Sequence, residues 1–144
     1  MKYSPLLVVL PVLGSLSLVL GCGGPASTAV PISGTVSVEG QPVEGGLITF
    51  LSVDDTAPAA GAPIKNGTYS AEVEPGEKKV MVLGTKVVGE EYILKGVPDS
   101  GTRQKLETIT HPNYNAKHLT PLTATVSGPS EEMNFDLKKN GKGK

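Results

Sequence analysis

Glycine and proline recur every few residues through most of this chain and leave little room for long regular elements. The 144 residues include 18 glycines and 12 prolines, four tyrosines, two phenylalanines and no tryptophan. Glycine supplies backbone conformations that other residues rarely adopt, and proline lacks the N–H group that helices and central strands need. Short runs of alternating apolar and polar residues lie between these breakers, which favours many short strands. We therefore expect an all-β fold.

A different pattern occupies the N-terminus, where Lys2 precedes a charge-free apolar run over residues 6–20 that ends just before Cys22. This build is typical of a secretory signal peptide. The run is short for a membrane-spanning helix, which needs about 20 apolar residues, and Pro11 interrupts it. We expect residues 1–21 to be a removed signal peptide. Cleavage at another position and an uncleaved helix are the alternatives.

The ending Val19-Leu20-Gly21-Cys22 resembles the lipobox of bacterial lipoproteins. The resemblance implies cleavage between Gly21 and Cys22, and attachment of fatty acyl chains such as palmitate to the Cys22 thiol and its new amino group. Stable anchoring takes more than one such chain. We expect an exported protein held on a bacterial membrane through Cys22, with its domain in the periplasm or on the cell surface. Gly23 stands where many inner-membrane lipoproteins have aspartate, so the resemblance favours an outer membrane.

The expected mature chain, residues 22–144, suits one domain. One of the 13 basic residues and none of the 14 acidic residues lie in residues 1–21, so its net charge would be −2. This balance gives no electrostatic footprint for nucleic acid. We expect a lipidated cysteine and flexible tether over 22–31, a β domain over 32–138 and a basic disordered tail over 139–144.

About seven short strands are expected in the domain, with turns between them. Asn66-Gly67 predicts a tight hairpin turn, because it supplies the positive φ angles that such a turn needs. The run 47–53 is apolar on both faces, which suggests a strand inside a sandwich. The expected strands are 32–38, 47–53, 62–64, 68–73, 77–83, 121–126 and 133–137. No strand–helix–strand unit is visible, so we expect a single antiparallel β-sandwich.

The pattern is lost over residues 90–118, where glycines and prolines fall among charges. We expect a long irregular excursion here, with one short strand near 106–109 and one short helical turn near 112–116. A connection of this length in a compact domain is often functional or mobile.

The segment from Ile32 to Phe50 resembles the start of a carboxypeptidase regulatory-like domain, a domain with a transthyretin-like fold. The matching features are the Gly-x-Val strand at Gly34, the turn Gly40-Gln41-Pro42-Val43, the hairpin Asn66-Gly67-Thr68-Tyr69 and the turn Pro75-Gly76. The match covers about residues 32–83, and the remainder resembles small secreted lipoproteins of planctomycete-type bacteria. The resemblance implies a fold but no activity, because these glycines and prolines serve the backbone.

Candidate reactive residues are few. His111 and His118 are the only histidines, and Pro112 disrupts the helix that would place them on one face. Zinc would also need a third protein ligand, so exposed loop histidines are the expectation and a metal pair the alternative. The acidic pairs Asp54-Asp55 and Glu90-Glu91 lack the spacing of calcium ligands. No nucleophile elbow or phosphate-binding loop occurs.

An enzymatic interpretation also fails on the resemblance. Hydroxyisourate hydrolases share the transthyretin-like fold, and similarity to them would require an early histidine and a closing Tyr-Arg-Gly-Ser motif. Here the only arginine is Arg103 and the chain ends in Gly143-Lys144. We expect no enzyme, with no catalytic residue, no metal and no cofactor.

The aromatic residues divide between the expected core and the excursion. Phe50 and Phe135 are expected in the core, and Tyr69 is expected to pack in the hairpin. Tyr92 and Tyr114 fall in the excursion, where they either pin it to the domain or offer a carbohydrate-binding surface.

Two hypotheses for function follow. The first is a non-catalytic, lipid-anchored cell-envelope protein that presents a β-sandwich as an interaction or scaffold module to an envelope protein or polysaccharide. The alternative is an envelope binding protein that holds a small ligand, sugar or metal through loop 90–118. Its candidate residues are Tyr92, His111, Tyr114 and His118.

Overall fold

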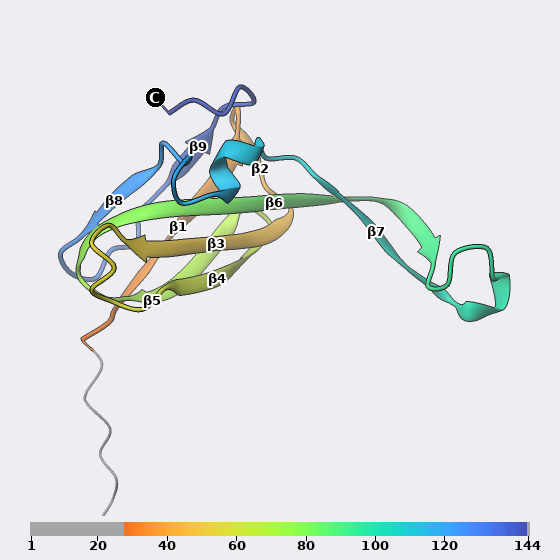
Figure 1. The fold of residues 1–144 in the computed structure, drawn as a ribbon, viewed down its shortest axis with the longest axis horizontal. Helices are drawn as coiled ribbons and strands as arrows, with labels where there is room; N and C mark the ends of the chain where they lie inside the picture. The colour runs from red at the N-terminus through yellow and green to blue at the C-terminus, as the bar shows by residue number, and fades with distance from the viewer. Residues whose placement is uncertain (1–27, 144) are drawn as a thin grey trace, which may run out of the picture.

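The computed structural model describes residues 28–143, which form one curled, mostly antiparallel β-sheet (Figure 1). The all-β expectation is therefore confirmed. The strands are β1 Val30–Val38, β2 Gln41–Pro42, β3 Gly45–Ser52, β4 Ala60–Lys65, β5 Thr68–Val73, β6 Gly76–Tyr92, β7 Thr102–Thr108, β8 Thr123–Val126 and β9 Phe135–Leu137. Two short 3-10 helices are η1 Pro98–Ser100 and η2 Pro112–Asn115. The expected signal peptide and Cys22 lie outside the described residues.

The strand order in the sheet is β2-β1-β5-β4-β3-β6-β7. The β4–β5 hairpin turns at Asn66-Gly67, where both residues have positive φ angles of 49° and 78°, as the sequence predicted. β8 pairs with the first part of β6, and β9 pairs with the second part of β1. The segment 123–137 thus connects two distant strands of the sheet. The β1–β9 pair is parallel, an exception to the antiparallel expectation.

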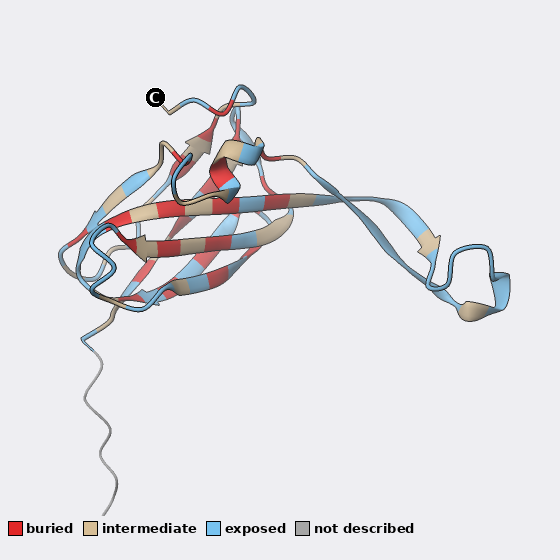
Figure 2. Cartoon of the chain, in the orientation of Figure 1, coloured by how far each residue is buried: buried red, intermediate tan, exposed pale blue. Residues whose placement is uncertain are grey.

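The core lies inside the curl and is built by alternate residues of each strand (Figure 2). Alternation buries one face because successive side chains of a strand point to opposite sides. The rings of Phe50, Tyr69 and Phe135 meet at its centre, with centroids 5.9–6.4 Å apart. The expected core positions Phe50 and Phe135, and the packing role of Tyr69, are confirmed.

Two expectations for the first half of the domain are wrong. The run 47–53 is buried on one face only, since Leu47 and Val53 are 46% and 47% exposed. The outer face of β3 meets solvent, so its apolar residues do not mark a second packed layer. The sheet also begins earlier than expected, because Val30 pairs with Val73 of β5 and takes the end of the expected tether into β1.

Part of the expected irregular excursion 90–118 is a regular hairpin, and the short strand expected near 106–109 overlaps the end of β7. β6 continues past Gly84 to Tyr92, and β7 pairs with its second half to form a projecting arm (Figure 1). β6 continues beyond Gly84 because its second half pairs with β7, which lies on the edge of β6 opposite to β3. The predicted helical turn near 112–116 is confirmed as η2.

The expected disordered tail is ordered as far as residue 143. The side-chain amide of Asn113 donates to the backbone oxygen of Gly141 at 3.3 Å, and the Tyr114 hydroxyl donates to that of Lys142 at 2.9 Å. Gly141 itself is buried. The tail therefore packs over η2, because polar groups of η2 satisfy its backbone.

Candidate functional site

The candidate residues from the sequence lie at two separate places. Tyr92 ends β6 at the far end of the arm, whereas His111, Tyr114 and His118 lie in and around η2 on the body (Figure 1). The structure does not bring these four residues together into one binding loop. Cys22, the expected lipidation site, lies outside the described residues.

Tyr114 has a structural role. It is fully buried, and its hydroxyl oxygen accepts a 2.9 Å hydrogen bond from the Lys138 backbone N–H. Its hydroxyl also lies 2.9 Å from the backbone oxygen of Lys142. A ring in this position pins η2 to the C-terminal segment and is not free to stack on a ligand. Of the two roles expected for Tyr114, the structure therefore favours pinning the excursion to the domain over binding a carbohydrate.

The two histidines differ in environment. His111 is half-buried and caps η2, because its Nδ1 accepts a 3.2 Å hydrogen bond from the Asn113 backbone N–H. His118 is exposed in the turn that follows η2. Within residues 28–143, no three histidine, cysteine or acidic side chains come together as a metal site.

The first acidic pair is explained by local structure. The Thr56 hydroxyl and backbone N–H donate to the Asp54 carboxylate at 2.7 and 3.2 Å, and these bonds lower the pKa of Asp54. The Asp55 carboxylate forms an ion pair with Lys117. Both carboxylates stabilise the loop after β3 and need no bound cation to explain them.

The projecting hairpin is the most distinctive feature of the molecule. We define the arm as residues 85–108, with its tip at residues 92–101. Its strands pair from Thr85 opposite Thr108 to Tyr92 opposite Thr102, with an irregularity between Val87 and Gly89. No residue of the buried core lies within the arm. A two-stranded hairpin without a packed face is only marginally stable in water, so the arm contributes surface and little to the core.

The two faces of the arm differ in character. Residues directly opposite each other on antiparallel strands share a face. On one face Lys86 pairs with Glu107 at 3.6 Å, and Glu91 pairs with Arg103 at 2.8 Å. Exposed ion pairs of this kind contribute about 1 kcal/mol or less each, so they set the register of the arm more than its stability.

The other face is apolar over part of its length. There Val87 lies opposite Leu106, and their side chains are 46% and 58% exposed. Tyr92 lies opposite Thr102 at the far end. No described element covers these side chains, so this face is available for contact.

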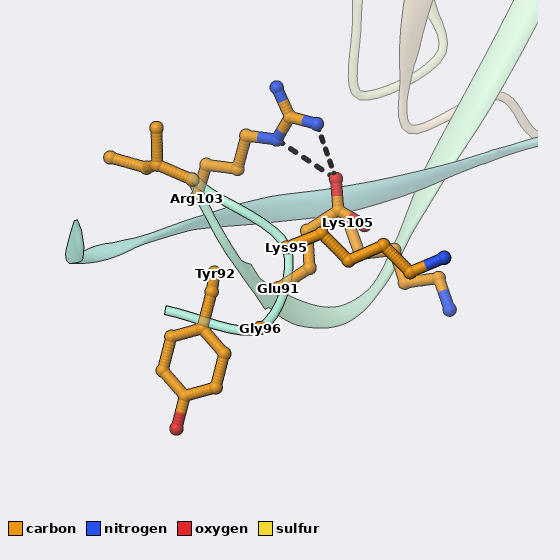
Figure 3. A pocket seen from close by; sticks show the side chains of 7 residues that line it. Glu91, Tyr92, Lys95, Gly96, Arg103 and Lys105 are labelled. Carbon is orange, nitrogen blue, oxygen red and sulfur yellow. Dashed lines mark hydrogen bonds and ion pairs between the residues drawn. The ribbon is translucent and has the colours of Figure 1, made fainter. Parts of the chain in front are cut away.

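The tip collects further apolar side chains in one short stretch. The exposed fractions there are 47% for Tyr92, 51% for Ile93, 59% for Leu94 and 44% for Val97. A shallow hollow at the base of the tip is lined by Glu91, Tyr92, Ile93, Lys95, Gly96, Arg103 and Lys105 (Figure 3). The Tyr92 ring points away from the Glu91–Arg103 ion pair (Figure 3). In the described part of the chain, Lys95 and Lys105 form no ion pair.

The tip has a defined conformation in spite of its exposure. The Ile93 backbone N–H donates to the oxygen of Gly101 at 3.0 Å, and that of Val97 donates to the oxygen of Leu94 at 3.0 Å. The Ser100 hydroxyl accepts from the Leu94 N–H at 3.0 Å and donates to the Val97 oxygen at 2.7 Å. The loop thus satisfies much of its own hydrogen-bonding capacity.

Sequence reasoning missed the arm, although a signal was present. Lys86 lies opposite Glu107, and Glu91 lies opposite Arg103. Opposite charges therefore face each other across a turn that contains Gly96. Complementary charges at matching distances from a turn are the pattern of a cross-strand ladder. Apolar alternation gives no signal for this ladder, because the arm buries neither of its faces.

Comparison with known proteins identifies no relative for this architecture. No protein-family model, no curated protein and no solved structure matches the chain. Among residues 28–143, no helix is long and apolar enough to cross a membrane.

Proposed function

We propose that this protein is a non-catalytic, lipid-anchored module of the bacterial cell envelope, which presents its arm to a partner. The observation that carries the proposal is the arm itself, a regular hairpin that projects from the body and contributes nothing to the buried core (Figure 2). Exposed apolar surface of this kind often marks an interaction site. Because the arm adds little to the stability of the body, we infer that its role is to make contact with a partner.

The edges of the arm support a role in binding. Pairing of β3 with β6 stops at Gly45 opposite Thr85. Beyond that point, within the described residues, β6 from Lys86 to Tyr92 pairs only with β7, which leaves one edge of each strand open. Open strand edges accept an added strand through backbone hydrogen bonds. An extended segment of an envelope protein would fit such an edge.

The N-terminus supports attachment to a membrane. The lipobox-like ending at Cys22 precedes Thr28 by six residues. Thr28 is already tied to the body, since its hydroxyl donates to Glu74 at 2.8 Å. Six residues span at most about 20 Å. A protein lipidated on Cys22 would therefore hold its domain close to the membrane surface.

The body is consistent with a scaffold of the carboxypeptidase regulatory-like type, which we include in the proposal. The turn at Gly40 joins β1 to β2, Asn66-Gly67 joins β4 to β5, and Pro75-Gly76 leads into β6. The turn residues that carry the resemblance thus lie between strands. In this proposal the curled sheet is a β-sandwich of transthyretin-like type.

The environment of the polar groups favours a non-catalytic role. Within the described residues every buried side-chain nitrogen and oxygen has a hydrogen-bond partner. Perturbed pKa values mark functional sites when groups of matched chemistry share a cleft. Here the lowered pKa values of Asp54 and Asp136 follow from hydrogen bonds that organise a turn and a strand end.

The anchor is tested with the Cys22→Ser variant. We expect the intact mass of the wild-type membrane fraction to match a diacylglyceryl-modified chain that begins at residue 22. The Cys22→Ser protein should move to the soluble fraction, whereas a Ser27→Ala control should stay with the membrane. If the Cys22→Ser protein is still processed and membrane-bound, the anchor is elsewhere.

The arm is tested by shortening it. Replacing residues 88–105 by Asn-Gly retains the pairs from Thr85–Thr108 to Val87–Leu106 and closes them with a favourable two-residue turn. The body should keep its free energy of unfolding, and envelope cross-links made by the full chain should disappear. The control Leu119→Ser changes an apolar residue of the body that is as exposed as the apolar residues of the tip. This variant should keep the cross-links. Unchanged cross-links in the shortened protein would exclude the arm as the contact element.

The alternative, a small-ligand site, has one observation in its favour, the hollow beside Tyr92 with its unpaired Lys95 and Lys105. An anionic sugar or similar ligand would suit that lining. A ligand at 100 times its Kd would raise the free energy of unfolding by about 2.7 kcal/mol. Such a shift in the wild type, lost in Tyr92→Ala, would favour this alternative over the interaction module.

A further inference from the structure

We propose that the tip of the arm docks on the lipid surface to which the N-terminus is anchored, so that the domain is held at two points. This inference rests on the lipid anchor proposed above and names the partner of the tip. Three features of the tip support it: its composition, the hydrogen bonding of its backbone and its position relative to the point where the chain leaves the body.

The side chains of the tip suit a membrane interface. Aliphatic side chains are exposed at Ile93, Leu94 and Val97, and their transfer from water into an apolar layer lowers the free energy. Tyr92 stands at the base of this cluster, and tyrosine is enriched at membrane interfaces because it is apolar with a polar end. Lys95 lies within the loop, and a lysine keeps its amino group among headgroups while its stem lies in the apolar layer.

The backbone of the tip is prepared for an apolar medium. An unpaired N–H or C=O group is costly to take out of water. The N–H groups of Ile93, Leu94, Val97 and Ser100 all have partners within the tip. These bonds reduce the number of backbone groups that docking would leave without a partner.

The position of the tip allows simultaneous contact with the anchor. In Figure 1 the chain leaves the body at lower left, and the arm descends to its tip at lower right, with the body above both. One plane can therefore touch both points while the body stays on one side. The short segment between Cys22 and Thr28 keeps that plane within about 20 Å of Thr28.

The charge of the arm favours contact through apolar groups. Residues 85–108 contain four basic and four acidic side chains, so the arm as a whole is neutral. Screening by salt weakens attraction between exposed charges and leaves apolar contacts almost unchanged. We therefore expect the docking of the tip to persist at high salt.

A tryptophan probe tests the proposal directly, because the chain has no tryptophan of its own. Leu94→Trp places the probe in the tip, and Leu119→Trp places a matched control on an exposed body position, 50% exposed in the native residue. Both are made in the full-length lipidated protein and inserted in phosphatidylethanolamine/phosphatidylglycerol vesicles. We expect Leu94→Trp emission to shift to shorter wavelength and to be quenched by brominated acyl chains, with no change for Leu119→Trp.

A second experiment separates the tip from the anchor. In the unlipidated Cys22→Ser chain, only the tip remains to contact the same vesicles, so we expect a weak, reversible association that does not retain the protein in the membrane fraction. Replacing Ile93 and Leu94 by serine should lower that association at least about tenfold, the amount expected for losing large apolar side chains. Leu47→Ser, which changes an exposed apolar residue of β3, should leave it unchanged.

The outcomes are distinguishable. Quenching of Leu94→Trp with wild-type lipidation supports the inference. An anchored protein whose Leu94→Trp probe stays in water overturns the inference and leaves the anchor intact. Quenching without any lipid on Cys22 refutes the anchor and supports the tip contact. A blue shift caused by envelope proteins in the absence of vesicles identifies a protein partner and overturns the inference.

Discussion

The backbone of Met133 lies so close to Gly34 that a Cβ atom on Gly34 would be 2.2 Å from the Met133 oxygen. The Met133 N–H donates to the Ser33 oxygen at 3.0 Å, and the Met133 oxygen accepts from the Tyr69 hydroxyl at 2.7 Å. These contacts hold the segment between β8 and β9 against β1. The glycine in the middle of β1 therefore makes the closure of the curled sheet possible.

Gly34→Ala should destabilise the protein by about 1–3 kcal/mol, the usual cost of forcing extra atoms into a packed region. The added methyl group meets backbone, which cannot move aside as a flexible side chain would. Gly128→Ala, in the segment between β8 and β9, is the control, because a Cβ atom there meets nothing within 4 Å. Urea unfolding should show a large loss for the first variant and a change within about 0.5 kcal/mol for the second.

Tyr114→Phe should destabilise the protein by about 1–3 kcal/mol, because the partly buried Lys138 N–H would lose its partner. Hydrogen exchange at the Lys138 amide should accelerate, since the tail is no longer held to η2. Tyr92→Phe removes a hydroxyl from an exposed tyrosine and should change the free energy of unfolding little. Equal effects of the two substitutions would argue against the role assigned to Tyr114.

Ser52→Ala should cost about 1–3 kcal/mol, because it removes the hydroxyl that partners a buried amino group. Lys78 is 2% exposed, and its Nζ donates to the Ser52 oxygen at 2.8 Å. Replacing both residues, with Ser52→Ala and Lys78→Met together, should be nearly neutral or stabilising, since replacing a buried polar pair by apolar groups is often tolerated. In the Lys78→Met background, Ser52→Ala should then cost less. A double-mutant cycle on urea unfolding measures this coupling, and strict additivity would contradict it.

Asp136→Asn should flatten the acid dependence of stability. Hydrogen bonds from the Lys138 side chain, the Ser37 hydroxyl and the Gly40 backbone N–H hold the pKa of Asp136 well below its ordinary value of 3.8. A carboxyl group with a lowered folded-state pKa stabilises the protein above its unfolded-state pKa, and that stabilisation is lost as the pH falls. Wild-type stability should therefore fall between about pH 5 and pH 2, and the variant should lose less over this range. Urea unfolding at several pH values measures the difference, and parallel profiles would contradict it.

Local pattern predicted the body well where one face of a strand is buried. Phe50 and Phe135 alternate with polar neighbours, and Asn66-Gly67 can hardly form anything other than a tight turn. These features depend on side-chain period and backbone freedom, which the sequence states directly.

Local pattern failed where distant segments decide the outcome. The regular pattern of the strand was expected to end at Gly84, with residues 85–89 either extending the strand or starting a loop. In the structure the Gly84 N–H donates to the Thr110 hydroxyl at 3.1 Å, and its missing side chain makes room for Thr110. Leu47 was expected inside, but no element among residues 28–143 covers it. Neither fact can be deduced from neighbouring residues, because Thr110 lies 26 residues from Gly84 and the exposure of Leu47 depends on how the whole sheet curls.

The sequence by itself determined an all-strand body, its turns and its core, because period and turn chemistry act over a few residues. Only the tertiary structure decided that residues 85–108 form a projecting arm and that the tail closes over Tyr114. The physical reason is distance along the chain. Contacts such as that of Ser37 with Asp136, 99 residues apart, form only when the sheet has brought the two segments together.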